Sequence, residues 1–104
     1  CNAQAQDSAW VLGRWELHFD PDGAKKDWLE FLPNGDAYNI WLDGERIPGF
    51  YLVTADSVKA VFTFHEKDMI MTFHFDTDKQ FLKIVTSKSG NPSIYKKINS
   101  LKLR

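Results

Sequence analysis

The side chains best able to perform chemistry are few and widely separated in this chain. Three histidines, His18, His65 and His74, fall in different parts of the sequence without the i, i+4 spacing of a zinc-binding helix. The Asp-x-Asp-Gly segment at residues 20–23 lacks the further oxygen ligands and the terminal glutamate of a calcium loop, so it is interpreted as a turn. No nucleophile motif, phosphate-cradling loop or paired cysteine ligand set occurs in the sequence. The sequence therefore predicts no enzymatic activity, no catalytic residues, no metal site and no cofactor.

The single cysteine, Cys1, opens the chain and precedes a small polar segment over residues 2–8. A lone cysteine cannot form a disulfide within the chain, and this segment has no apolar periodicity that would place the thiol in a core. Both facts are explained by a mature bacterial lipoprotein whose Cys1 thiol carries the lipid. Two acyl chains suffice for durable attachment, because each buried methylene contributes roughly 0.8 kcal/mol. The alternative is a chain that merely happens to begin at a cysteine.

Length and composition indicate one domain with its own core. The chain has 104 residues, of which 43% are hydrophobic, and its net charge of −1 gives no electrostatic footprint for nucleic acid. Residues 1–9 are predicted to form a flexible lipoprotein tether and residues 10–104 a single domain. No apolar run approaches the roughly 20 residues of a membrane-spanning helix. Asn2 stands where inner-membrane lipoproteins of Gram-negative bacteria usually carry Asp, which favours the outer membrane, with the domain in the periplasm or at the cell surface.

From residue 10 onward, short apolar stretches alternate with turn residues at intervals of roughly 8–12 residues, which is typical of an all-β sandwich or barrel. Asn34-Gly35 and Asp43-Gly44 have the turn chemistry of tight hairpins. Because each segment can pair with its sequence neighbour, the predicted fold is a small antiparallel up-and-down β-barrel of about eight strands. The predicted strands are Gly13–Phe19, Asp27–Leu32, Asp36–Leu42, Arg46–Val53, Val58–Phe64, Met69–Phe75, Phe81–Ser87 and Ser93–Ile98.

The apolar alternation of the fifth and sixth strands predicts their facing and register. A turn over residues 65–68 gives the opposed pairs Phe64–Met69, Phe62–Met71 and Ala60–Phe73. This wholly apolar face is assigned to the barrel interior. Short strands with many aromatic side chains favour a filled interior, without a cavity larger than a small apolar molecule needs. If a ligand does bind inside, the candidate pocket residues are Tyr38, Tyr51, Phe62, Met69, Met71 and Phe73.

Apolar side chains are also predicted on the outside of the barrel. With a tight turn at Asn34-Gly35, Trp28 and Trp41 meet across the second and third strands on the outer face. Grouped surface aromatics are typical of protein interfaces, and the alternative is that a terminal segment or the 20–26 loop covers them. The candidate partner surface comprises Trp28, Trp41, Phe50 and Leu52.

Several short motifs follow one another along the chain in a recognisable order. They are Gly13-Arg14-Trp15, Trp28-Leu29-Glu30-Phe31, Asn34-Gly35-Asp36-Ala37-Tyr38, Gly49-Phe50-Tyr51, Leu82-Lys83-Ile84 and Tyr95-Lys96-Lys97. This order resembles the small bacterial lipocalin-like (calycin) lipoproteins over about residues 10–98. The resemblance implies that the signature residues Gly13 and Trp15 mark the barrel base, which Trp15 closes against a basic side chain from Lys96 or Lys97. Such a resemblance in fold does not supply an activity.

Two functions are therefore weighed for a lipid-anchored envelope protein. The sequence favours binding of a protein partner, as an inhibitor or immunity-type module, and the alternative is a lipocalin-like carrier of a small apolar ligand. Self-association into a homodimer is a third hypothesis. Membrane contact is expected through the N-terminal lipid, and no nucleic-acid partner is expected. A cavity in the barrel would favour the carrier, whereas exposed aromatic side chains on its wall would favour a protein partner.

Overall fold

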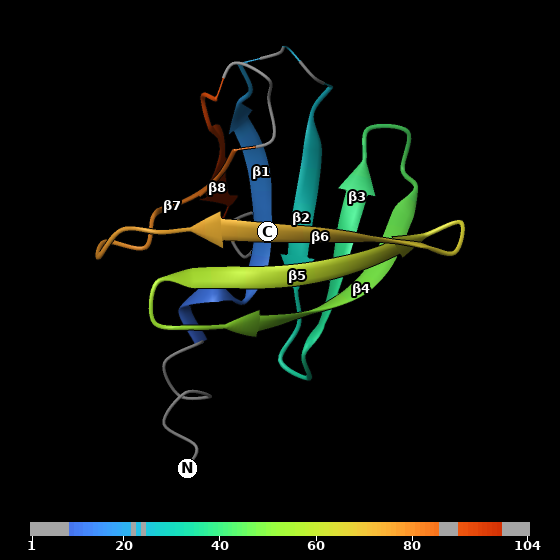
Figure 1. Cartoon of the computed structure of the whole chain (residues 1–104), viewed down its shortest axis with the longest axis horizontal. Helices are drawn as coiled ribbons and strands as arrows, with labels where there is room; N and C mark the ends of the chain where they lie inside the picture. The colour runs from blue at the N-terminus through green and yellow to red at the C-terminus, as the bar shows by residue number, and fades with distance from the viewer. Residues whose placement is uncertain (1–8, 22, 24, 86–89, 99–104) are drawn as a thin grey trace, which may run out of the picture.

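Eight antiparallel strands close into a barrel in which each strand pairs with the next along the sequence and the last pairs with the first (Figure 1). The computed structural model describes residues 9–21, 23, 25–85 and 90–98. The elements are the 3₁₀ helix η1 (Ala9–Val11) and the strands β1 (Gly13–Phe19), β2 (Asp27–Phe31), β3 (Asp36–Trp41), β4 (Arg46–Val53), β5 (Ser57–Phe64), β6 (Lys67–His74), β7 (Phe81–Ile84) and β8 (Ser93–Ile98).

The predicted all-β, up-and-down, lipocalin-like barrel is confirmed. The observed strands begin and end within two residues of the predicted ones, apart from the seventh, whose predicted end at residues 86–87 lies outside the described residues. Cys1 and most of the predicted tether also lie outside them. Over the described part of the chain, no helix has the length and apolar character needed to cross a membrane.

The N-terminal segment packs against one end of the barrel, and Figure 1 shows η1 next to the lower end of β1. The indole of Trp15 is fully buried, and its Nε1 donates to the carbonyl oxygen of Val11 at 2.9 Å. The Lys97 Nζ lies 5.2 Å from the centre of the Trp15 ring and donates to the carbonyl oxygen of Trp10 at 2.7 Å. Trp15 thus closes the base, and the basic side chain beside it is Lys97, because Lys96 is exposed.

Replacing Lys97 tests this contact. The Lys97→Ala variant removes a cation from an indole face together with a charged hydrogen bond, so we expect the free energy of unfolding to fall by about 1–2 kcal/mol. Lys96→Ala is the matched control, since its side chain is exposed on the same strand, and it should change stability by less than about 0.5 kcal/mol. Urea unfolding followed by circular dichroism measures both changes. Equal losses in the two variants would contradict the role assigned to Lys97.

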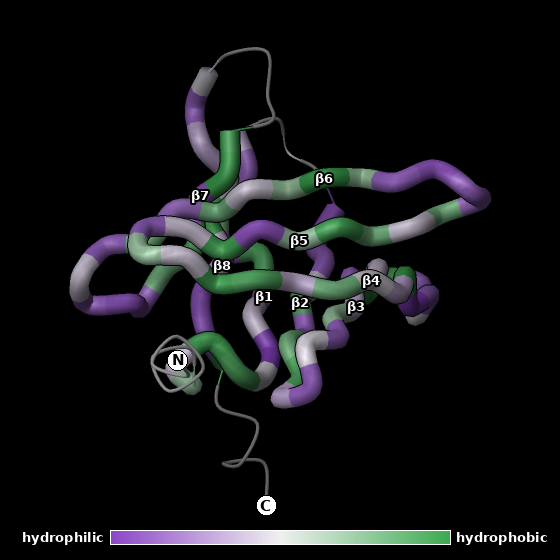
Figure 2. Tube along the Cα trace, turned by 60° about the horizontal axis from the view of Figure 1, so that its bottom comes forward, coloured by the Kyte–Doolittle hydropathy of each residue, from purple (hydrophilic) through white to green (hydrophobic). Residues whose placement is uncertain are grey.

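The facing of β5 and β6 is as predicted, but their register differs by two residues. Phe62 pairs with Met69 instead of Met71. The cause is the turn, because His65 and Glu66 both have positive φ (52° and 67°) and form a two-residue turn in place of the predicted four-residue one. A shift of two residues keeps every side chain on its face. Figure 2 shows the hydrophilic tip of this hairpin projecting beyond the hydrophobic parts of its strands.

The turn between β2 and β3 also differs from the predicted one. The Gly35 amide donates to the carbonyl oxygen of Leu32 at 3.1 Å, and the Leu32 amide donates to that of Asp36 at 2.9 Å. Three residues therefore form the loop, with Pro33 at the second position of the turn and Gly35 at a φ of 97°. A loop one residue longer than a tight two-residue turn shifts the register by one, and that reverses the facing of β3.

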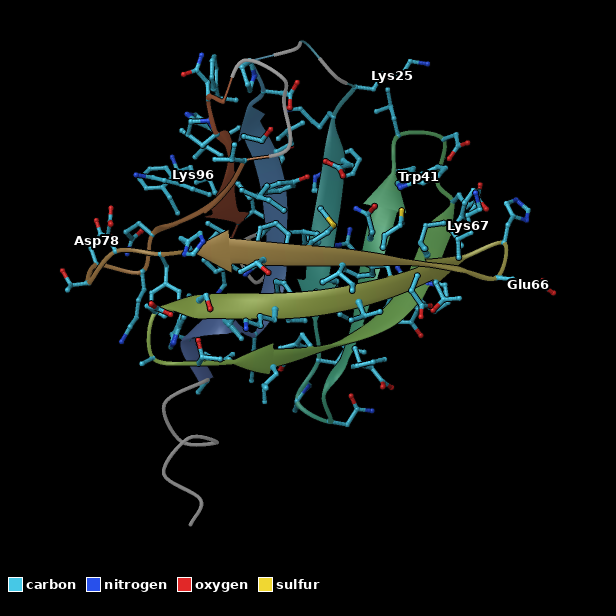
Figure 3. All side chains as sticks on the ribbon, viewed as in Figure 1. Lys25, Trp41, Glu66, Lys67, Asp78 and Lys96 are labelled. Atoms are coloured by element: carbon cyan, nitrogen blue, oxygen red, sulfur yellow. The ribbon has the colours of Figure 1, made fainter. Side chains whose placement is uncertain are left out.

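This reversal corrects the predicted outer aromatic pair. Trp41 pairs with Asp27 and packs against the central core, whereas Trp28 pairs with Ile40 on the outer side. The predicted contact between Trp28 and Trp41 on the outer face is therefore wrong. Charged side chains occupy the extremities, where Glu66 and Asp78 point away from the barrel (Figure 3). The largest fully buried side chains are Trp15, Phe31, Phe62, Phe73, Leu29, Ile47, Leu82, Val11 and Val58.

Candidate functional site

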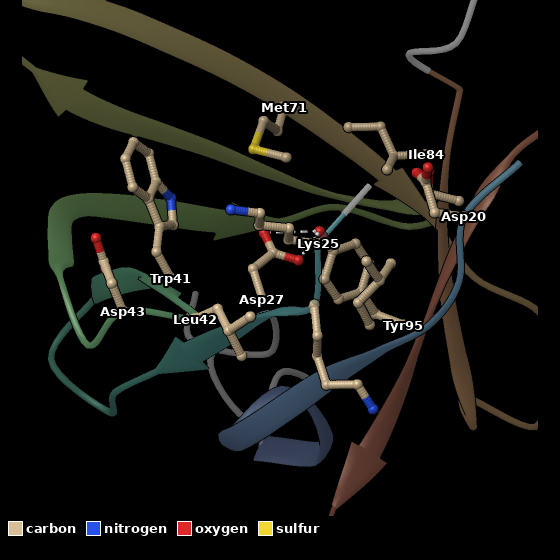
Figure 4. Close-up of a pocket in the computed structure, with 12 residues that line it drawn as sticks. Asp20, Lys25, Asp27, Trp41, Leu42, Asp43, Met71, Ile84 and Tyr95 are labelled. Carbon is tan, nitrogen blue, oxygen red and sulfur yellow. Dashed lines mark hydrogen bonds between the residues drawn. The ribbon is translucent and has the colours of Figure 1, made fainter. Parts of the chain in front are cut away.

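The end of the barrel opposite Trp15 carries a pocket of about 590 Å³ (Figure 4). This volume lies in the range of about 300–1,000 Å³ that is usual for small-molecule sites. The lining residues are Leu17, Asp20, Lys25, Lys26, Asp27, Trp41, Leu42, Asp43, Met71, Ile84, Ser93 and Tyr95. The predicted filled interior therefore holds for the closed half of the barrel and is wrong for the open half.

Five strand ends meet at this pocket. The end of β1, the start of β2, the end of β3, the end of β7 and the start of β8 all lie at the open end of the barrel. Asp27 begins β2 and alternates with the buried residues Leu29 and Phe31 on the interior face. Ser93 and Tyr95 take the corresponding buried positions at the start of β8. Small and polar side chains thus stand where continued apolar alternation would have filled the barrel.

A network of hydrogen bonds fixes the base of the pocket, which is the group of polar lining residues Asp20, Asp27, Ser93 and Tyr95 at the open end of the barrel. The Tyr95 hydroxyl donates to the two carboxylate oxygens of Asp27, at 2.8 and 3.1 Å. The Asn39 Nδ2 donates to the same carboxylate at 2.9 Å, and its Oδ1 accepts a hydrogen bond from the Trp41 Nε1 at 2.8 Å. These bonds hold the Trp41 ring and the Asp27 carboxylate in fixed positions. Buried polar groups that are paired in this way stabilise one arrangement of side chains.

A second, adjacent hydrogen bond ties the start of β8 to the end of β1. The Ser93 hydroxyl donates to the Asp20 carboxylate at 2.5 Å. Ser93 is buried and Asp20 is half-buried, and both line the pocket. Two carboxylates, each accepting a hydroxyl hydrogen bond, therefore lie at one end of the pocket.

Burial controls the protonation of these groups. Desolvation raises the pKa of Asp27, and the nearby Asp20 charge adds to the rise, while the hydrogen bonds from Asn39 and Tyr95 oppose it. Desolvation also raises the pKa of Tyr95, and the Asp27 charge reinforces that effect. The Tyr95 hydroxyl therefore remains protonated at neutral pH and continues to donate to Asp27.

The raised pKa of Asp27 predicts a pH dependence of stability. The folded state binds a proton on Asp27 more tightly than the unfolded state, so this group costs stability when pH rises from the ordinary value of 3.8 through the raised pKa. Asp27→Asn removes this titration. We expect the free energy of unfolding of the wild type, relative to that of the variant, to be highest near pH 4 and to decline toward neutral pH. Urea unfolding of both proteins at a series of pH values measures the difference, and a rise with pH would contradict it.

The structure brings few of the predicted pocket residues to the pocket. Met71 lines it, whereas Phe62 and Phe73 are fully buried in the central core and Met69 packs against that core. The side chains of the other two predicted pocket residues, Tyr38 and Tyr51, lie away from the pocket. Tyr51 donates from its hydroxyl to the carbonyl oxygen of Leu32 at 2.7 Å, and Tyr38 carries the Arg46 guanidinium 4.3 Å above its ring.

The predicted partner surface is divided by the corrected register. Phe50 and Leu52 are exposed on the outer wall, with 59% and 61% of their surface accessible. Trp28 is half-buried beside Ile40, and Trp41 lies inside at the pocket. Exposed apolar side chains therefore do lie on the wall, but the two tryptophans do not form one group there.

Most of the pocket residues were not among the predicted site residues. Asp27 carried the clearest available signal, because it shares the alternate positions of Leu29 and Phe31, two residues that belong in a core. A carboxylate at such a position must be hydrogen-bonded or lie at a solvent-filled site. Trp41 could not have been assigned to the pocket, because its facing depends on the length of the Pro33–Gly35 loop.

Comparisons with known proteins add nothing about function, so any inference about function rests on the fold and the pocket. No family model, curated protein or solved structure matches the chain. The resemblance to lipocalin-like lipoproteins therefore stays a prediction, apart from the fold itself. Among the residues that the structure describes, no group of three or more His, Cys, Asp and Glu side chains is placed to hold a metal ion.

Proposed function

We propose that this barrel binds a small molecule with an apolar body in the pocket at its open end. The observation that carries the proposal is the pocket itself, which combines a volume of about 590 Å³ with a hydrogen-bonded polar base. Leu17, Met71 and Ile84 provide apolar lining. A few convergent polar groups in an otherwise apolar recess are typical of sites that orient a small ligand. Of the two functions weighed from the sequence, this arrangement supports the carrier.

The construction of the barrel suits such a role. The closed end is packed solidly around the fully buried Trp15. Trp41 presents its ring beside the pocket (Figure 4). Its indole is held by the hydrogen bond to Asn39. A ligand therefore meets side chains that are already oriented, which lowers the entropy cost of binding.

Titration with the uncharged fluorescent probe N-phenyl-1-naphthylamine tests the proposal. We expect saturable binding at one site per chain, and Met71→Arg should weaken it at least tenfold by placing a charge in the apolar lining. Ile70→Arg is the matched control, because Ile70 is the adjacent residue of β6 and is 75% exposed on the outer wall. Absence of saturable binding, or equal weakening by both substitutions, would overturn the proposal.

A second candidate function is protein binding through the outer wall. An outer-wall patch (Phe50, Leu52, Val61 and Ile70) runs across β4, β5 and β6, where Phe50 pairs with Val61 and Val61 pairs with Ile70. Three of its four side chains are more than half exposed. A contiguous apolar patch on an outer wall favours an interface with another protein.

The charges beside the outer-wall patch favour a second copy of this chain as the occupant. Lys59 pairs with Leu52 on one side of the row, and Asp68 lies on the other side, where it accepts a hydrogen bond from Thr63 at 2.8 Å. A two-fold axis along the row would bring Lys59 toward Asp68 of the partner subunit. Such an interface is self-complementary, as the symmetry of a two-fold dimer requires.

Sedimentation velocity over a range of protein concentrations tests the dimer. We expect the wild type to associate as concentration rises, and Ile70→Arg to remain monomeric because it places a charge at the centre of the contact. A wild type that is monomeric at every concentration would remove this candidate. The inhibitor or immunity-type role would use the same wall, and it stays a prediction together with the lipid on Cys1 and the envelope location.

A further inference from the structure

We infer that the pocket selects a ligand that donates hydrogen bonds and carries positive charge, such as a primary amine attached to an apolar chain or ring. This inference rests on the proposed small-ligand function and adds the chemical class of the ligand. It follows from three features of the pocket, which are the way its own donors are used, the sign of the charges at its base and the aromatic surfaces beside them.

The protein's own donors at the base of the pocket are directed at protein acceptors. The Tyr95 hydroxyl donates to Asp27, the Ser93 hydroxyl to Asp20 and the Trp41 indole to Asn39. What the base presents to a ligand is therefore carboxylate oxygen. An ionised carboxylate accepts hydrogen bonds and donates none. A ligand group that fits this base must supply the donors itself.

The negative charge at the base of the pocket also favours a positively charged ligand. The charge of Asp20 repels that of Asp27 and adds to the rise in the pKa of Asp27, although desolvation by burial is the larger cause. A cation placed beside them relieves this repulsion and replaces part of the lost hydration of Asp27. An anion would add a third negative charge to a half-buried pair, which is unfavourable in surroundings of low dielectric constant.

The lysines at the rim do not reverse this preference. Lys26 forms an ion pair with Glu16 at 3.3 Å, so its charge is already matched by a residue that does not line the pocket. Lys25 is exposed at the rim, where water and salt screen its charge. A third carboxylate, that of Asp43, is exposed at the same rim. Three of the five charged side chains that line the pocket are therefore carboxylates, and one of the two lysines is paired with a residue outside it.

Aromatic side chains complete the match with an amine. Trp41 and Tyr95 both line the pocket, and the face of an aromatic ring attracts a cation electrostatically. Leu17, Met71 and Ile84 offer apolar surface to the rest of the molecule. A ligand with an ammonium group at one end and a hydrocarbon body satisfies both parts of the pocket, whereas a fully apolar ligand leaves the carboxylates desolvated without compensation.

Three ligands of equal chain length test the inference. Octylamine, 1-octanol and octanoate differ only in the charge and donor capacity of the head group, and each is titrated below its aggregation concentration to displace N-phenyl-1-naphthylamine at pH 7. We expect octylamine to bind at least tenfold more tightly than octanoate, with 1-octanol between them. Octanoate binding as tightly as octylamine would overturn the inference and leave the pocket function standing. Failure of the probe and of all three ligands to bind would instead overturn the proposed function.

Substitutions of Asp20 and Asp27 test whether these two carboxylates cause the preference for an amine. In Asp20→Asn and Asp27→Asn the advantage of octylamine over 1-octanol should shrink severalfold, because each substitution removes one negative charge from the lining of the pocket. Asp68→Asn is the control, because this exposed carboxylate lies on the outer side of β6. Raising the salt concentration from 20 to 500 mM should reduce the same advantage in the wild-type protein, which requires no variant to fold. An advantage that survives both the substitutions and the salt would contradict the assignment to these carboxylates.

Discussion

Replacing Trp15 with alanine should lower the free energy of unfolding by about 4 kcal/mol, within the range of about 3–5 kcal/mol for removing a large buried aromatic side chain. The indole is fully buried, donates to Val11 and lies under the Lys97 ammonium. The Trp10 ring packs edge-on against it, with 6.1 Å between the ring centroids. One substitution therefore removes the contact surface for three other groups. Since small domains have a total stability of about 5–15 kcal/mol, this single substitution removes a large share of it.

Chemical denaturation followed by circular dichroism measures this loss without depending on tryptophan emission. Trp28→Ala is the matched control, because it removes the same side chain from a half-buried position on the outer side of β2. We expect the control to lose about 1 kcal/mol, in line with a partly exposed residue. If Trp15→Ala were no more damaging than the control, Trp15 would not be the residue that closes the base.

Gly49→Ala should destabilise the barrel by about 3 kcal/mol or more, although it adds only one methyl group. A Cβ at this position would lie 2.0 Å from the carbonyl oxygen of Val61 and 2.9 Å from the Cα of Phe62. Both are backbone atoms of β5, the strand that pairs with β4 at this point. Rotation of a side chain cannot relieve such a clash, so the two strands must separate locally. Overpacking of this kind usually costs about 1–3 kcal/mol, and more where backbone must move.

The adjacent residue provides the control for this effect. Phe50 is 59% exposed on the outer wall, so Phe50→Ala removes many more atoms than Gly49→Ala adds. We nevertheless expect Phe50→Ala to cost less than about 1 kcal/mol. Thermal and urea unfolding of both variants measure which of them loses more stability. A Phe50→Ala loss larger than that of Gly49→Ala would show that β4 and β5 can accommodate the extra atom.

Strand positions could be predicted from this sequence because each strand pairs with its neighbour. Apolar alternation marks β5 and β6 without reference to distant residues, and their facing is correct even though the register is shifted by two. The choice between a four-residue turn and a two-residue turn depended on His65 and Glu66 adopting positive φ. Neither residue is a strong signal for that conformation, which glycine, asparagine and aspartate favour.

The pocket was harder to predict, because it depends on one residue of loop length and on contacts between distant strands. The Pro33–Gly35 loop decides whether Trp41 faces inward, and the Asn-Gly pair within it is compatible with either turn length. The bond between Asp27 and Tyr95 joins residues from β2 and β8, which are not paired with each other. No local pattern encodes such a contact. The fold was therefore accessible from periodicity, and the site was not.

The pairing of β8 with β1 has a consequence for how the chain folds. Every other strand pair joins immediate neighbours through a hairpin, whereas this one joins residues from nearly opposite ends of the domain. The entropic cost of loop closure is therefore concentrated at a single seam, and hairpins can form before it. Because Trp15 and Lys97 are partners across that seam, the base of the barrel is completed only when the ends of the domain meet.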